Sequence, residues 1–369
     1  MYKEEDLVCV ARRENNTKRS YLVVNRLQAK HIPAKPGRTL ELFDQLAQLV
    51  KREYGNETLL LIGFAETATA VGARLAVYLN SYYMQTTRET ETGVNYIYFS
   101  ESHSHATEQK LAKDGLDEAV GRVQRIVFVE DEVTTGNTVK KIIQIIRDKY
   151  NGAFSFSVAS LLNGMSGEAI GQFRSDGIGI HYILKTDHSD YTERAASYEG
   201  DGTYYEKAGA GDAVQWDFRE LCGYVNARHL VSGRQYREAC QRLWEQVHAE
   251  LGNRSGQRIL VLGTEEFMYP AIYAASRLED EGNEVRCHAT TRSPIEVSTE
   301  ETYPLHARFE LRSFYDSGRT TYVYDLGKYD LALVFTDACG MARDGADTLM
   351  GALCECGNTD IVLYRWCEL

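Results

Sequence analysis

Residues 125 to 138 read RIVFVEDEVTTGNT, and this stretch decides the fold that the sequence predicts. Ile126 to Val129 form a short apolar run rich in β-branched residues, which is typical of a buried strand. Apolar positions recur at helical spacing from Thr138 onward, so the stretch joins a strand to a helix. In an open α/β sheet, ligands bind beyond the carboxyl ends of the strands, and residues 130 to 138 are therefore expected to form a binding loop.

The expected binding loop combines two kinds of chemistry. Glu130 and Asp131 are adjacent carboxylates that can accept hydrogen bonds from vicinal hydroxyls or hold a hydrated Mg²⁺, which prefers one or two carboxylates plus substrate phosphates. Hydroxyls and successive backbone N–H groups follow at a helix N-terminus, where they favour an anion such as phosphate. These residues are Thr134, Thr135, Gly136, Asn137 and Thr138. A diol site beside a phosphate site predicts a ribose 5-phosphate ligand.

Residues 130 to 138 resemble the phosphoribosyl-pyrophosphate (PRPP) motif of type I phosphoribosyltransferases, in the form found in orotate phosphoribosyltransferases. Asn137 is the one departure, since many relatives have glycine there, but asparagine adopts a left-handed conformation more readily than most residues. The resemblance implies a Rossmann-like α/β fold with a central, mostly parallel sheet and flanking helices. It also implies Mg²⁺ as cofactor, held by Glu130 and Asp131 mostly through substrate and water.

The same resemblance assigns roles to residues before the motif. The loop after the expected strand at residues 58–62 matches the pyrophosphate-binding loop, and it consists of Phe64, Ala65, Glu66 and Thr67. Arg88 follows the expected strand at residues 83–87, where relatives place a basic residue on the pyrophosphate, and a guanidinium suits a forked contact with phosphate oxygens.

Residues 90–123 lack a sustained period and are expected to form a long loop. Their position before the motif strand matches the mobile loop that closes over PRPP in type I enzymes. His103 and His105 lie on the same side of an extended segment there and are expected, with Glu130, Asp131 and Arg88, to take part in catalysis.

The composition limits the classes of function. A chain of 369 residues exceeds what one hydrophobic core usually serves, so two domains are expected. The formal net charge of −12 argues against binding to nucleic acid or an anionic membrane, because both need clustered Lys and Arg. No apolar run approaches the roughly 18 residues of a membrane span, and the N-terminus lacks a signal-peptide core, so a cytoplasmic protein is expected.

The second half of the sequence repeats the first. Four pairs of segments match in order: 29–32 (AKHI) with 227–230 (ARHL), 59–63 (LLLIG) with 259–263 (ILVLG), 86–88 (TTR) with 290–292 (TTR), and 128–131 (FVED) with 334–337 (VFTD). Their offsets of 198, 200, 204 and 206 rise in one direction, as a duplication with small insertions requires. Thr336 replaces Glu130 and the run of hydroxyls has no counterpart, so the copy is not expected to bind PRPP in the same way.

Residues 291–294 spell Thr-Arg-Ser-Pro, the signature of the TRSP domain. A phosphoribosyltransferase followed by TRSP resembles two-domain proteins associated with bacterial tellurite-resistance operons, which are thought to make a nucleoside-like metabolite. The expected organisation is a phosphoribosyltransferase domain at 1–195, a Gly-rich linker at 196–222, and a degenerate TRSP duplicate at 223–369. The hood that selects the acceptor base is expected in residues 21–36, and contributions from the second half are left open.

Two functions fit these features. In the first, the protein transfers the phosphoribosyl group of PRPP to an unidentified base-like acceptor and releases pyrophosphate. In the second, it keeps the motif as a non-catalytic PRPP sensor or regulator. Release of pyrophosphate distinguishes the two, whereas binding of PRPP alone does not.

The second half has two open roles. Type I relatives often act as homodimers, and a fused duplicate can reproduce that arrangement as a pseudo-dimer within one chain. The long insertion at residues 295–322 carries cations, and Arg308, Arg312 and Arg292 would in that case lend positive charge to the PRPP site. The alternative is that the second half stabilises the first or binds the acceptor.

Overall fold

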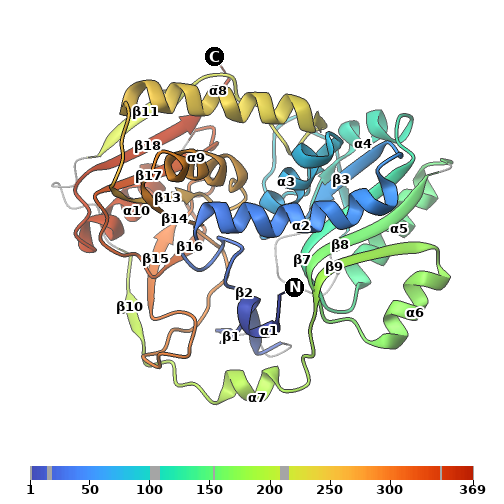
Figure 1. Cartoon of the computed structure of the whole chain (residues 1–369), viewed down its shortest axis with the longest axis horizontal. Coiled ribbons are helices and arrows are strands. Elements are labelled where there is room, and N and C mark those ends of the chain that lie inside the picture. Colours follow the sequence, from blue (N-terminus) through green and yellow to red (C-terminus); the bar gives the residue numbers. More distant parts are fainter. Residues whose placement is uncertain are drawn as a thin grey trace. The chain divides into compact units, whose positions relative to one another are not determined.

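The computed structural model describes residues 2–14, 19–99, 109–152, 154–207, 216–340 and 343–368 (Figure 1). The chain forms two compact units, each assembled from separate stretches of sequence. The motif unit comprises Leu40–Thr186 and Val225–Ala239, and the repeat unit comprises Met1–Thr39, Asp187–Tyr224 and Cys240–Leu369. Two long helices, α2 (Pro36–Tyr54) and α8 (Gly233–Leu251), contribute residues to both units. The sequence predicted contiguous domains, whereas both units take in segments from each half of the chain.

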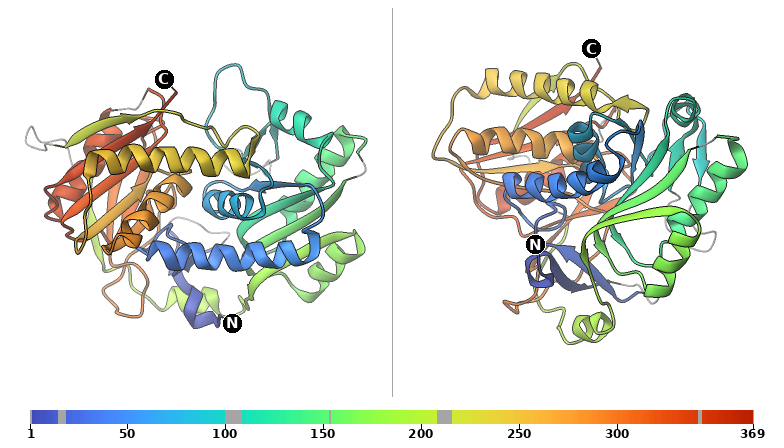
Figure 2. Two further views of the ribbon diagram at one scale, coloured as in Figure 1. Left: turned by 45° about the horizontal axis from the view of Figure 1, so that its top comes forward. Right: turned by 45° about the vertical axis from the view of Figure 1, so that its right-hand side comes forward.

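The motif unit is built on a six-stranded sheet in the order β12-β4-β3-β7-β8-β9. Its strands are β3 (Leu59–Gly63), β4 (Tyr82–Gln85), β7 (Arg125–Val133), β8 (Ser155–Asn163), β9 (Ile178–Lys185) and β12 (Val231–Ser232). All are parallel except β12, which runs antiparallel to β4 at the edge. The strands β7, β8 and β9 lie side by side in both views of Figure 2. The α/β fold with a mostly parallel sheet is therefore confirmed.

Helices pack against both faces of this sheet. They are α3 (Thr69–Leu79), α4 (Lys113–Val120), α5 (Asn137–Lys149) and α6 (Gly167–Ser175), together with most of α2. Met84 and Phe128 share one hydrophobic core with apolar residues of α4, α5 and α6. Tyr83 points to the opposite face, because side chains alternate along a strand, and its hydroxyl donates to Thr69 O on α3. The motif helix α5 and the helix α3 therefore cover opposite faces of the sheet.

Residues 90–123 contain more regular structure than the sequence predicted. β5 (Tyr96–Tyr98) and β6 (Lys110–Ala112) form an antiparallel pair, and α4 follows directly. Leu116 and Ala119 are buried on one face of α4. A helix of eight residues is too short for this apolar spacing to be recognised in the sequence. His103 and His105 lie outside the described residues.

The repeat unit is built on a five-stranded parallel sheet in the order β14-β13-β17-β18-β11. Its strands are β11 (Asp217–Leu221), β13 (Arg258–Gly263), β14 (Glu284–Ala289), β17 (Leu331–Thr336) and β18 (Ile361–Trp366). A hairpin pairs β1 (Val8–Arg12) with β2 (Tyr21–Asn25), and a small sheet joins β10 (Thr203–Tyr205), β15 (Ala307–Arg312) and β16 (Thr320–Tyr324). The helices are α1 (Glu4–Leu7), α7 (Tyr191–Ala196), α9 (Tyr269–Asp280) and α10 (Arg343–Glu355).

The strand orders of the two sheets agree with the predicted internal duplication. β4-β3-β7-β8 of the motif unit corresponds to β14-β13-β17-β18 of the repeat unit, in the same order and direction. The fifth strands differ in their position along the chain. β9 follows β8, whereas β11 precedes the other four strands of its sheet. The stretch 196–222 is accordingly not a free linker, because β10 and β11 within it are hydrogen-bonded to β15 and β18.

Residues 21–36, the expected hood of the PRPP site, belong to the repeat unit. Ala34 forms a bridge with Cys287 on β14, and Ala289 N donates to Lys30 O over 3.2 Å. The matching edge of the motif unit carries residues of the second half, because Gln85 N donates to Ala227 O over 2.8 Å and β12 pairs with β4. Edge pairing therefore decides which sheet each of these segments joins.

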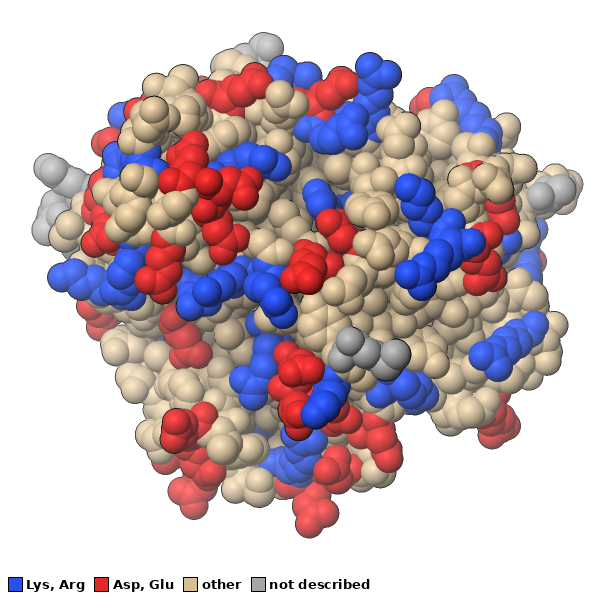
Figure 3. Space-filling model, viewed as in Figure 1, with Lys and Arg blue, Asp and Glu red and all other residues tan. Residues whose placement is uncertain are grey.

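Acidic and basic side chains are interspersed over the face of the molecule drawn in Figure 3. Among the described residues, no helix is both long enough and apolar enough to cross a membrane.

Candidate functional site

The candidate site lies where β7 and β3 end side by side in the motif unit. β7 extends to Val133, four residues beyond the predicted strand, because residues 130, 132 and 133 continue to pair with β8. Phe64 N, just after β3, donates to Val129 O over 3.0 Å. Thr67 Oγ1 donates to Asp131 Oδ1 over 2.8 Å. The structure thus joins the expected pyrophosphate loop directly to the acidic end of the motif strand.

Glu130 differs from Asp131 in its surroundings. Side chains alternate along β7, so Glu130 points to the face that α5 covers, and Asp131 points to the other. Burial raises the pKa of Glu130 well above its ordinary value, and the negative charges of Asp131 and Glu132 raise it further. The two carboxyl groups therefore point to different faces of the sheet.

The predicted phosphate loop leads from β7 into the N-terminus of α5. Gly136 has a φ of +73° and forms the N-cap, and Lys140 N donates to Gly136 O over 3.0 Å. Asn137 is already the first helical residue, so the left-handed conformation that the sequence suggested for it falls on Gly136 instead. Thr135 and Asn137 are exposed, and Thr134 and Thr138 are half-buried. The exposed end of a 13-residue helix suits an anion.

The loop at residues 64–67 is fixed from three sides. Ala65 N donates to Thr86 Oγ1 over 2.8 Å, and Ala65 O accepts from Gln109 Nε2 over 3.1 Å. Glu66 is buried, and its carbonyl accepts from Thr69 Oγ1 over 3.4 Å. The Ala65–Glu66 peptide is cis. These contacts hold the loop against the ends of β4 and β6.

The structure corrects the predicted role of Phe64 as a pyrophosphate contact, because its side chain packs in the hydrophobic core. Its side chain is 1% exposed and lies 5.6 Å from the Phe99 ring and 5.8 Å from the Phe128 ring, measured between centroids. Its backbone N–H and carbonyl bond to Val129 O and Ala68 N. An apolar residue at a strand end is drawn into the core even where the loop around it binds a ligand.

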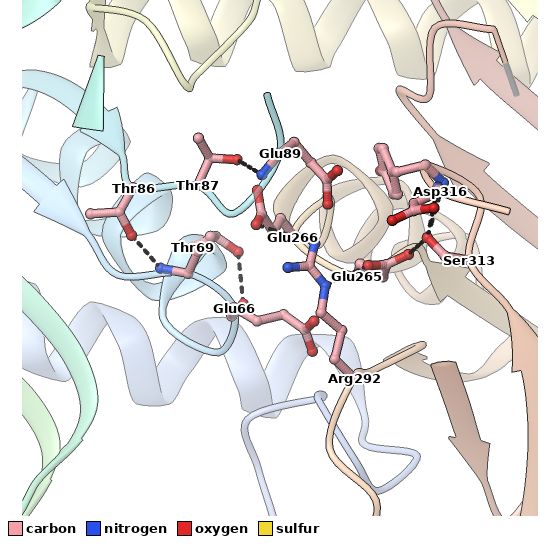
Figure 4. A network of polar contacts seen from close by, with 12 residues as sticks. Glu66, Thr69, Thr86, Thr87, Glu89, Glu265, Glu266, Arg292, Ser313 and Asp316 are labelled. Carbon is pink, nitrogen blue, oxygen red and sulfur yellow. Dashed lines mark hydrogen bonds and ion pairs between the residues drawn. The ribbon is translucent and has the colours of Figure 1, made fainter. Parts of the chain in front are cut away.

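Residues 86–91, here called the 86–91 wall, follow β4 and lie beside the loop at residues 64–67. Thr87 and Lys110 exchange two backbone hydrogen bonds, and Thr87 Oγ1 accepts from Glu89 N over 2.9 Å (Figure 4). Lys110 is buried and its Nζ donates to Thr90 Oγ1 over 2.5 Å. Arg88 is half-buried within this anchored segment, beside the Ala65–Thr86 contact. The basic residue thus belongs to the same structural neighbourhood as the pyrophosphate loop.

Glu91 ends this wall and contacts residues from the second half of the sequence. His229 Nε2 lies 2.8 Å from Glu91 Oε2, and Asn226 Nδ2 donates to both carboxylate oxygens over 3.2 Å. The hydrogen bond with His229 is the main reason that the pKa of Glu91 is lowered, and the same bond raises the pKa of His229. Sequence reasoning missed Gln109, Asn226 and His229 as parts of the site, although the repeat of residues 227–230 was a signal.

The repeat unit uses the equivalent positions for internal ion pairs. Glu265 is buried, and Arg292 Nε and Arg319 Nη1 lie 2.6 and 3.0 Å from its carboxylate. Ser313 Oγ donates to the same carboxylate over 2.5 Å (Figure 4). The counterpart of Arg88 therefore neutralises a carboxylate of its own unit.

The carboxylate at the equivalent strand end of the repeat unit is also engaged by side chains of its own unit. Asp337, the counterpart of Asp131, accepts hydrogen bonds from Tyr224 and Tyr315 over 2.7 and 2.6 Å. Thr336 Oγ1 accepts from Thr264 Oγ1 over 2.9 Å. These contacts agree with the sequence-based expectation that the copy does not bind PRPP in the same way.

The other second-half cations also have partners within the repeat unit. Arg308 Nη1 lies 2.5 Å from Glu14 Oε2 and 3.2 Å from Ile295 O. Arg312 is exposed, and its Nη1 donates to Ser317 O over 3.3 Å. A contribution of Arg292, Arg308 and Arg312 to the candidate site stays a prediction.

The donor set for a metal ion is small. Among the described residues, no group of three or more His, Cys, Asp and Glu side chains is placed to hold an ion. Glu130 and Asp131 supply two carboxyl groups at the strand end, which fits Mg²⁺, since this ion usually takes one or two carboxylates and completes its shell with substrate phosphates and water.

Two family models match the chain in succession. The model described as phosphoribosyl transferase matches residues 7–180, and the model described as TRSP domain, C terminus to PRTase_2, matches residues 226–352. A comparison with curated protein sequences finds no significant match.

Solved phosphoribosyltransferase structures resemble about half of the chain. Adenine phosphoribosyltransferase from Rhodothermus marinus is 13% identical, with a TM-score of 0.36 over 49% of this chain and 96% of its own. The enzyme from Trypanosoma brucei, in complex with AMP, pyrophosphate and ribose-5-phosphate, is 17% identical, with a TM-score of 0.35 over 50% and 78%. Orotate phosphoribosyltransferase from Aeropyrum pernix is 17% identical, with a TM-score of 0.32 over 52% and 94%.

Proposed function

We propose that the chain, which a phosphoribosyl transferase model matches at residues 7–180 and a TRSP-domain model matches at residues 226–352, transfers the 5-phosphoribosyl group of PRPP to a base-like acceptor. In this reaction the bond between C1′ of the ribose and the pyrophosphate oxygen breaks, and a bond from the acceptor nucleophile to C1′ forms. Pyrophosphate leaves and the acceptor loses a proton. The product is a nucleotide-like compound, which suits biosynthesis of a nucleoside-like metabolite.

One observation supports this proposal above all others. The 2.8 Å hydrogen bond from Thr67 to Asp131 joins the loop at residues 64–67 to the acidic end of the motif strand. The α5 N-terminus, which suits the 5-phosphate, begins only six residues after Asp131 in the same β7–α5 connection. The proposed sites for pyrophosphate, ribose and 5-phosphate would therefore follow one another along a single sheet edge, as PRPP requires.

Each part of the proposed site has a separate task. The α5 N-terminus with Thr134, Thr135 and Thr138 binds the 5-phosphate, and Glu130 and Asp131 hold the ribose hydroxyls from two sides. Ala65, Glu66, Thr67 and Arg88 orient the pyrophosphate. Positioning and stabilisation of developing charge carry such a reaction, since the leaving group becomes more negative as the bond breaks. Mg²⁺, when bound beside Glu130 and Asp131, supplies positive charge to the pyrophosphate.

The test measures pyrophosphate release from PRPP and Mg²⁺ with a panel of nucleobases and related heterocycles. Asp131→Asn removes a charge-assisted contact worth about 1.5–3 kcal/mol, so kcat/KM for PRPP is expected to fall at least about tenfold. Asp337→Asn, at the equivalent strand end of the repeat unit, is the matched control and is expected to keep the wild-type value. Tight PRPP binding without pyrophosphate release from any acceptor would favour the PRPP-sensing alternative. Equal rates for wild type and Asp131→Asn would contradict the site.

A further inference from the structure

The two units exchange a segment between the halves of the sequence. In the motif unit, residues 226–232, here called the exchanged segment, run along β4: Val231 pairs with Tyr83, and Gln85 N donates to Ala227 O. In the repeat unit, residues 29–34 run along β14, the counterpart of β4. The repeated segment from the second half of the sequence thus lies at the edge of the motif-unit sheet, and the one from the first half lies at the edge of the repeat-unit sheet.

Lys30 shows what this segment does in the repeat unit. Its side chain is 1% exposed, and Nζ donates to Glu265 O and Thr290 O, each over 2.8 Å. Glu265 N in turn donates to Thr290 Oγ1 over 3.0 Å. The ammonium group therefore lies against the loop that follows β13 and the turn that follows β14.

The loop and turn that Lys30 joins have direct equivalents at the candidate site. Ala65 N donates to Thr86 Oγ1 just as Glu265 N donates to Thr290 Oγ1. The sequence repeat places Arg228 at the position of Lys30, since AKHI matches ARHL. By this equivalence, we expect the Arg228 guanidinium to lie against the loop at residues 64–67 and the Thr86 turn.

Other observations place Arg228 beside Glu91. Its side chain is 6% exposed, and its backbone N–H donates to Asn226 Oδ1 over 3.0 Å, which fixes the turn that presents it. The pKa of Glu91 is lowered chiefly by its hydrogen bond with His229, and the positive charge of Arg228 contributes to the same shift. Arg228 is thus a buried cation beside the 86–91 wall that carries Arg88.

We propose that Arg228, supplied by the exchanged segment, is a positioning residue that lends buried positive charge to the pyrophosphate end of the PRPP site. This inference rests on the proposed function. A charge held away from water acts more strongly on a neighbouring anion than an exposed one, and a guanidinium stays protonated there. Arg228 lies within the residues that the TRSP model matches, so in this proposal that domain contributes to the PRPP site.

The test compares Arg228→Gln with Lys30→Gln, which removes the equivalent buried cation from the unit without a PRPP motif. Thermal stability, KM for PRPP, kcat and the Kd of Mg²⁺-pyrophosphate are measured for each full-length protein. Arg228→Gln is expected to raise the KM for PRPP and the Kd of pyrophosphate about tenfold, the effect of one charge-assisted contact. Lys30→Gln is expected to lower the melting temperature and leave both constants unchanged.

Arg228→Lys keeps the charge in the form that the repeat unit already uses. It is expected to keep the pyrophosphate Kd close to the wild-type value, and it decides the matter if Arg228→Gln does not fold. Unchanged constants in a folded Arg228→Gln, or a tenfold loss in a folded Arg228→Lys, would overturn the inference while leaving the proposed function standing. A wild-type protein that binds neither PRPP nor pyrophosphate would overturn both.

Discussion

Gly136→Ala tests the geometry of the phosphate loop. A Cβ added at Gly136 would lie 2.5 Å from Phe173 Cζ and 2.7 Å from Cε2, and the backbone there has a φ of +73°. The left-handed conformation costs about 1–2 kcal/mol for a residue with a side chain, and crowding in a packed core adds about 1–3 kcal/mol. The expected total is a loss of about 2–5 kcal/mol in the free energy of unfolding.

Gly177→Ala is the matched control for this prediction. Gly177 has a φ of +71°, and an added Cβ would meet nothing within 4 Å, so only the conformational cost of about 1–2 kcal/mol applies. Thermal unfolding is followed with and without PRPP and Mg²⁺. Gly136→Ala is expected to be the less stable variant and to show a smaller ligand-induced rise, because the rise follows RT ln(1 + [L]/Kd). Equal destabilisation of the two variants would refute the crowding argument, and an undiminished rise would place the 5-phosphate elsewhere.

Three further predictions concern the site. Thr135→Val and Thr138→Val remove hydroxyl donors at nearly constant shape, so the thermal shift given by PRPP should shrink; an unchanged shift argues against a phosphate contact. Burial raises the pKa of Glu130, so ionisation of this carboxyl group costs stability as the pH rises from about 4.5 through the raised pKa. Glu130→Gln should therefore have a higher melting temperature than wild type near neutral pH and no gain at about pH 4.5. The raised pKa of His229 gives stability below about pH 6.5 that is lost as pH rises through that pKa, and Glu91→Gln should flatten this dependence; a profile identical to wild type would rule out the pair.

The sequence predicted the strand, loop and helix of the motif because each has a local signal. Apolar β-branched residues, hydroxyls and helical periodicity are all contained within residues 125–150. The end of β7 at Val133 was not predictable in the same way, because its last residues are held in the strand by pairing with β8. Likewise, the burial of Phe64 depends on Phe99 and Phe128, which are distant in sequence.

The repeat was readable from sequence, but its placement was not. The match of residues 29–32 with 227–230 shows that two segments are alike, yet similarity carries no information about which sheet edge each one joins. Val231 and Ser232 are hydrogen-bonded to β4, some 150 residues earlier in the chain, and only tertiary pairing determines that choice. For the same reason, β10 and β11 were hidden in a stretch whose glycines suggested a linker.

The exchanged segment has a consequence for synthesis on the ribosome. The motif unit needs β12, so its sheet cannot be finished until residue 232 has left the exit tunnel, well after its motif strand has emerged. The repeat unit combines residues up to Thr39 with β18 (Ile361–Trp366), so those early residues cannot be part of a complete unit until β18 has been made. Domains usually fold in turn as they emerge, but here neither unit is complete before the second half is made. Nascent chains stalled before and after residue 239 would show this as a late, abrupt gain of protease resistance in the motif unit.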